Sequence, residues 1–99
     1  MITHVVSVRL SDKSQVSFAA GQMRKLAACP SVASIVVGEN LGLTPTSWDI
    51  VIVTQHDNID QLAEFRADEY HKELGRSIIE YVDTNSSVDF DSGDAVTVV

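Results

Sequence analysis

The spacing of the apolar residues constrains this chain most, because it switches between two periods along the sequence. In residues 2–10, ITHVVSVRL, side chains at alternate positions share a face, which is typical of a β-strand. The even positions form the more apolar face of that strand. From Val16 onward, apolar residues recur every three or four positions, which predicts a helix that Pro30 ends. The predicted buried face of this helix consists of Ala19, Ala20, Met23, Leu26 and Ala27.

The middle of the chain predicts two more strands. Residues 31–41, SVASIVVGENL, and residues 48–55, WDIVIVTQ, are rich in β-branched residues. The loop between them is short enough for a hairpin-like antiparallel connection. Asn58 and Gln61 then form a capping-box-like pair, which predicts the start of a second helix. The predicted inner face of this helix consists of Ile59, Leu62, Ala63 and Arg66.

A second apolar set follows out of phase with the first. It consists of His71, Leu74, Ile78 and Val82. We therefore expect a break near residues 67–69 and a new helix that continues to about Asp83. Residues 86–90, SSVDF, predict the fourth strand.

The resulting order, β-α-β-β-α-β, predicts an α+β fold of the ferredoxin-like sandwich type, with a four-stranded antiparallel sheet and the helices on one face. Residues 1–91 would form one domain and residues 92–99 a C-terminal tail or arm. The other face of the sheet would stay uncovered, carrying Val5 among Thr3, Ser7 and Arg9 on the first strand. A second copy of the chain could bury this face without any other partner, so we predict a homodimer through the open sheet face.

Composition excludes several classes of function. The chain has 14 acidic and 7 basic residues and a net charge of −7, which argues against nucleic-acid binding. Its one cysteine, Cys29, cannot form an intrachain disulfide and is expected to be a buried thiol. No basic-then-apolar leader opens the sequence and no apolar run is long enough to span a membrane, so a cytoplasmic location without membrane contact is expected.

Several of these stretches together resemble the stress-responsive dimeric α/β-barrel (Dabb) family. They are ITHVVSVRL, CPSVASIVVGENL, WDIVIVTQHDNIDQLAEF, DEYH and SSVDF, and their order and spacing over residues 1 to 91 carry the resemblance. It implies two ferredoxin-like chains joined sheet to sheet into a barrel. Some members resemble polyketide cyclases such as olivetolic acid cyclase, which work without a cofactor through a histidine base.

The resemblance also assigns residues. His71 matches the family histidine of a His-Pro-x-His stretch, and His4 matches the histidine on the first strand. Asp68 and Glu69 replace the His-Pro pair, and Phe65 stands where a cyclase-type member has a tyrosine. These two departures separate the chain from a faithful cyclase.

The candidate chemistry is therefore that of histidine. An imidazole titrates near neutral pH, so His71 is predicted as a base or proton shuttle with His4 beside it. The predicted pocket walls are Val6, Val8, Phe18, Phe65, Leu74 and Ile78. The structural alternative is a pair of core histidines that are hydrogen-bonded to the backbone or to each other. His56, next to Asp57, is expected in an exposed turn without a role.

The sequence predicts neither a metal site nor a cofactor. It has no ligand pair at a spacing such as His-x3-His or Cys-x2-Cys and no glycine-rich phosphate loop. The leading hypothesis is a protein that binds a small apolar carbonyl or aromatic compound, with cofactor-free cyclase, lyase or isomerase chemistry if it is an enzyme. A non-catalytic stress or interaction protein is the second hypothesis, and a cofactor-free monooxygenase is the third. A cavity of about 300 Å³ or more, touched by both imidazoles, would favour ligand binding.

Overall fold

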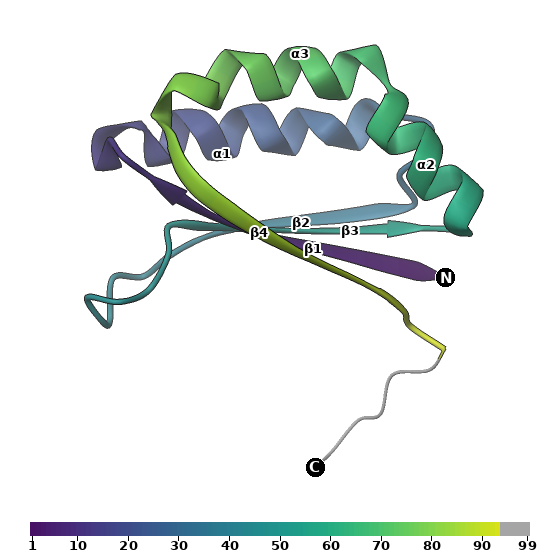
Figure 1. The fold of residues 1–99 in the computed structure, drawn as a ribbon, viewed down its shortest axis with the longest axis horizontal. Coiled ribbons are helices and arrows are strands. Elements are labelled where there is room, and N and C mark those ends of the chain that lie inside the picture. Colours follow the sequence, from purple (N-terminus) through teal and green to yellow (C-terminus); the bar gives the residue numbers. More distant parts are fainter. Residues whose placement is uncertain (94–99) are drawn as a thin grey trace.

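The computed structural model describes residues 1–93, which fold into one antiparallel sheet with α-helices on a single face (Figure 1). The sheet has the order β2-β3-β1-β4. The order of elements along the chain confirms the predicted ferredoxin-like α+β fold. The elements are β1 Ile2–Leu10, α1 Val16–Arg24, β2 Ser34–Glu39, β3 Ile50–His56, α2 Ile59–Ala67, α3 Glu69–Ile78 and β4 Val82–Asp91.

The core lies between the sheet and the helices α1, α2 and α3. The even positions of β1 face the helices, and Val8 and Leu10 are buried there, as their alternation predicted. Helix α1 ends earlier than Pro30, because Lys25–Ala28 forms a 3-10 turn. Such a turn has three residues per turn, so the side chains rotate out of the α-helical register. Ala27 is therefore exposed, contrary to the prediction, whereas Leu26 and Cys29 are buried.

The second helical region breaks at Asp68, inside the predicted interval. The Asp68 backbone is extended, and its carboxylate accepts a hydrogen bond from the Tyr70 amide, so the residue ends α2 and caps α3. Asn58 caps α2 as predicted, by accepting from the Gln61 amide at 2.9 Å.

The predicted inner face of α2 is partly wrong. Ile59 is 71 % exposed, and Ala63 and Arg66 are also exposed, while Leu62 and Phe65 are buried. The buried stripe thus includes Phe65 in place of Arg66, one position earlier than predicted.

Helix α3 stops at Ile78, and the chain enters β4 at Val82, so the predicted helix end at Asp83 is also wrong. Val82 pairs with Leu10 on β1 and packs on the core from the sheet. Val82 therefore packs on the same core cluster as Ile78 of α3, although it is a strand residue.

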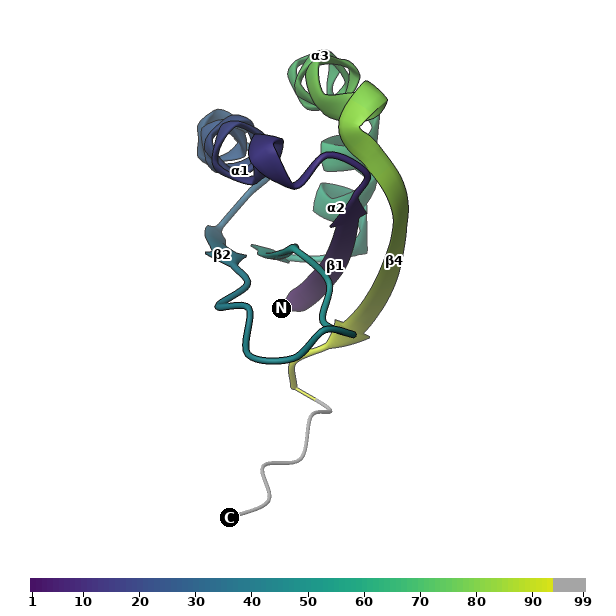
Figure 2. The same ribbon diagram turned by 90° about the vertical axis from the view of Figure 1, so that its left-hand side faces the viewer.

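The opposite face of the sheet carries a row of valines. Val36 pairs with Val53, Val53 with Val5 and Val5 with Val88, so the row crosses all four strands. Figure 2 shows the sheet from its end, with the helices on one side and no described element covering the other. Val36 and Val88, at the two edges, are each 62 % exposed.

None of the helices within residues 1–93 is long and apolar enough to cross a bilayer. Of the predicted tail at residues 92–99, positions 94–99 lie outside the described residues.

Candidate functional site

A cavity of about 200 Å³ lies between helix α3 and the sheet. His4 and His71 both line it, from β1 and α3 respectively, as expected from their shared apolar settings. Of the predicted wall residues, the structure places five around the cavity: Val6, Val8, Phe65, Leu74 and Ile78. Phe18 is not among them. Its side chain is 47 % exposed and packs edge-on against Tyr81, with ring centroids 6.2 Å apart.

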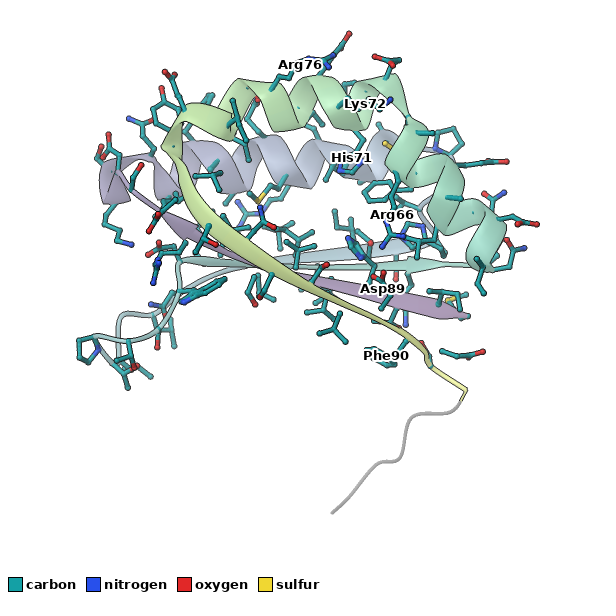
Figure 3. All side chains as sticks on the ribbon, viewed as in Figure 1. Arg66, His71, Lys72, Arg76, Asp89 and Phe90 are labelled. Carbon is teal, nitrogen blue, oxygen red and sulfur yellow. The ribbon has the colours of Figure 1, made fainter. Side chains whose placement is uncertain are left out.

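The His4 imidazole is anchored from the edge strand. Its Nδ1 contacts the carboxylate of Asp89, the residue directly opposite on β4, and the other carboxylate oxygen is bound by the Arg66 guanidinium. Figure 3 shows Arg66 and Asp89 together at the end of α2. Burial raises the pKa of Asp89, but the hydrogen bonds from His4 and Arg66 outweigh this and hold that pKa below its ordinary value. The carboxylate is therefore ionised at neutral pH and accepts the His4 Nδ1–H.

The His71 imidazole is anchored by the helix break. Its Nδ1 donates to the Phe65 carbonyl at 3.0 Å, and the Asp68 amide donates to the same oxygen at 3.3 Å. The break leaves this carbonyl without its normal helical donor, so the two bonds act as a C-terminal cap. The His71 ring also stacks on Phe65, with centroids 4.2 Å apart and planes 11° apart. In Figure 3, the side chain points from α3 toward the sheet.

The third histidine, His56, was predicted to be exposed, and this is wrong. It is fully buried, with 0 % exposure, and its ring lies 5.0 Å from that of Phe65. Nδ1 donates to the Ser31 carbonyl at 2.7 Å, and Nε2 lies 2.8 Å from the Thr54 hydroxyl. His56 shares the helix-facing parity of Ile50, Ile52 and Thr54, which is why it turns inward.

The mouth of the cavity lies between α3 and β4, and the sequence analysis missed it. The exposed Gly75 lines it from α3, the exposed Ile79 from the 3-10 turn that follows this helix, and Asn85 from β4. On the helix-facing side of β4, Asn85, Ser87 and Asp89 pair with Val8, Val6 and His4. These polar side chains stay exposed, so the cavity is closed by apolar residues on β1 and β3 and open along β4. The other lining residues that the sequence analysis missed are Met23, Leu26, Ile52, Thr54 and Val82.

Residues 1–93 contain no group of three or more histidine, cysteine or carboxylate side chains placed to hold a metal ion. Cys29 is buried, and burial together with the nearby Asp68 carboxylate raises the pKa of its thiol, which keeps it protonated and unreactive at neutral pH.

The chain belongs to the stress-responsive A/B barrel domain family, whose model matches residues 2–92. A dimeric ferredoxin-like protein of unknown function from Thermobifida fusca has a similar structure, with a TM-score of 0.79, 25 % identity, and coverage of 90 % of this chain and 88 % of that one. A dimeric protein of unknown function from Bacteroides fragilis gives a TM-score of 0.75 at 20 % identity, over 91 % and 94 % of the two chains. An antibiotic biosynthesis monooxygenase gives 0.72 at 12 % identity, over 93 % and 98 %, which shows a shared fold and no more. No curated protein matches the chain.

Proposed function

We propose that this protein binds a small, largely apolar carbonyl or aromatic compound in the cavity between α3 and the sheet. The observation that carries the proposal is an apolar cavity lined by two imidazoles, each held in place through its Nδ1 atom. Its volume of about 200 Å³ is below the ~300 Å³ predicted from the sequence to favour ligand binding, but an engineered cavity of ~150 Å³ already holds benzene. The cavity therefore suits a ligand built on one ring.

If the protein is an enzyme, its chemistry is proton transfer without a cofactor. The Nε2 atoms of His4 and His71 have no hydrogen-bonding partner among residues 1–93, so either can take a proton from a bound compound. The product of that step is an enolate or phenolate beside an imidazolium. His71 is the proposed base, and Asp89 positions His4 by fixing its ring.

The non-catalytic alternative has its own supporting observation. His71 caps the broken end of α2, and His56 bonds to the Ser31 carbonyl, which are structural tasks. His71→Asn separates the two roles, because the Asn amide can still donate to the Phe65 carbonyl while the Nε2 base is lost.

We also propose a homodimer through the open sheet face. The valine row and the partly exposed Phe90 would leave a contiguous apolar patch in a monomer. Phe90 lies on that face in Figure 3, on the side of the sheet away from the helices. The similar proteins from Thermobifida fusca and Bacteroides fragilis are both described as dimeric.

The test is an NMR binding screen of single-ring ketones and aromatics against the wild type and Val6→Phe, which fills the cavity. Ile59→Phe, at an exposed position, is the matched control. Binding that survives in the control and is lost in Val6→Phe supports the proposal, and the absence of any ligand across the panel contradicts it.

Catalysis is tested separately, by hydrogen–deuterium exchange at the α-carbon of a bound ketone. Exchange that falls in His71→Asn supports the base assignment. Equal exchange in wild type and variant, above the rate without protein, contradicts the assignment of His71 as the base. Exchange no faster than without protein supports the non-catalytic alternative.

A further inference from the structure

The hydrogen bonds of the three histidines fix which hydrogen-bonding groups the cavity offers. The partners of Nδ1 are the Asp89 carboxylate, the Phe65 carbonyl and the Ser31 carbonyl, and all three can only accept. Every one of these histidines therefore carries its proton on Nδ1. In the neutral imidazole, the opposite nitrogen, Nε2, is then an acceptor.

The polar group on the cavity floor follows the same rule. Thr54 is fully buried and lines the cavity, and its hydroxyl lies 2.8 Å from the His56 Nε2. Since Nδ1 carries the His56 proton, the Thr54 hydroxyl must donate to Nε2. Its single hydrogen is thereby committed, and Thr54 has no donor left for a ligand.

With neutral imidazoles, the interior of the cavity thus presents the Nε2 atoms of His4 and His71 and the Thr54 hydroxyl oxygen as acceptors and, within residues 1–93, no side-chain donor. Among the lining residues, Asn85 alone carries a side-chain amide, and it is exposed at the mouth. Behind His4, Asp89 and Arg66 form an ion pair without net charge, and no lysine or arginine of the described chain lines the cavity, so nothing in this lining attracts an anion.

We propose that the cavity selects a neutral ligand that donates hydrogen bonds, namely a single-ring phenol or the enol form of a cyclic ketone. This inference rests on the proposed ligand-binding function and adds the chemical class. It excludes carboxylates, and it excludes carbonyl compounds that have no enol or hydroxyl group.

The experiment compares 4-methylphenol with 1,4-dimethylbenzene, in which a methyl group replaces the hydroxyl at nearly the same size, and with benzoate. Binding to the full chain is measured by NMR at pH 8. An apolar cavity without acceptors would prefer the hydrocarbon, because burying a hydroxyl without a partner is unfavourable. We expect 4-methylphenol to bind about tenfold tighter than 1,4-dimethylbenzene and benzoate not to bind.

His71→Asn, which keeps the Phe65 hydrogen bond and loses Nε2, is expected to weaken 4-methylphenol about tenfold and to leave 1,4-dimethylbenzene unchanged. Long-range ¹H–¹⁵N spectra of the imidazoles give an independent readout, with Nδ1–H expected for all three rings. Thermal unfolding of the variant checks that it is folded.

The outcomes separate the two proposals. The proposed class of hydrogen-bond-donating ligands is wrong if the hydrocarbon binds as tightly as the phenol, if benzoate binds best, or if His71 carries its proton on Nε2. The first two of these outcomes would still show that the cavity binds ligands. If neither ring compound binds, the proposed ligand class is wrong, and if the panel of ketones and aromatics gives no ligand either, the proposed function itself is wrong.

Discussion

Replacing Asp89 by Asn tests whether the His4–Asp89–Arg66 arrangement stabilises the fold. Asn keeps an oxygen for the His4 Nδ1–H but loses the charge, and a charge-assisted hydrogen bond is about twice as strong as a neutral one. With about 2 kcal/mol for the charged bond, this loss is about 1 kcal/mol. The ion pair with Arg66 is partly exposed, with side chains 51 % and 33 % exposed, so it adds at most about 1 kcal/mol. We expect Asp89→Asn to lower the free energy of unfolding by about 1 to 2 kcal/mol at pH 7.

The pH dependence of this difference is a sharper test than its size. The folded-state pKa of Asp89 lies below the ordinary value of 3.8, so the stability it contributes is fully present well above pH 3.8. It is lost as the pH falls through the folded pKa, because protonated Asp and Asn are nearly isosteric. Urea unfolding of both proteins from pH 7 to pH 3 should show the two curves converging at the acidic end. A constant gap down to pH 3, or no gap at pH 7, would refute the reasoning.

Three further predictions concern other parts of the molecule. Gly75→Ala and Gly21→Ala should each raise the free energy of unfolding by about 0.5 to 1 kcal/mol in thermal unfolding, since both glycines lie inside helices and an added Cβ would meet no neighbouring atom. Of the two variants, only Gly75→Ala should change ligand affinity, because Gly75 lies at the mouth of the cavity. Asp49→Asn should cost about 1 to 3 kcal/mol at pH 7 and less as the pH falls below 3.8, because burial raises the Asp49 pKa but the bonds from Lys13 and the Leu10 amide outweigh it and lower that pKa. A loss at pH 3 as large as the loss at pH 7 in urea unfolding would contradict this. Val5→Lys should weaken the proposed dimer at least about 100-fold in sedimentation, whereas Ile59→Lys should not; equal behaviour of the two would place the interface elsewhere.

Sequence periodicity predicted the fold because one face of each strand packs against the helices and the other does not, so the two faces carry different residues. In β1, alternation alone placed Val8 and Leu10 in the core. The same rule, extended by one step along β3, would have found His56 on the inner face. Its neighbour Asp57 suggested an exposed turn, and the strand in fact continues through His56 itself.

The anchors of the histidines could not be predicted in this way. Asp89 reaches His4 only through the pairing of β1 with β4, across 85 positions of sequence. A shift of one residue in that register would turn Asp89 to the other face of the sheet. The bond from His71 to the Phe65 carbonyl likewise depends on the backbone geometry at Asp68, where the sequence indicated a break but not its angle.

The two neighbouring residues Phe65 and Arg66 connect both cavity histidines to the same turn of α2. The Phe65 carbonyl holds His71, and the Arg66 guanidinium holds the carboxylate that fixes His4. A rotation or slide of this single turn would release His71 directly and would take Arg66 away from the carboxylate that holds His4, so the surroundings of the two imidazoles are linked. Relaxation measurements on the rings should then show correlated motion on one timescale, governed by the end of α2 rather than by either histidine.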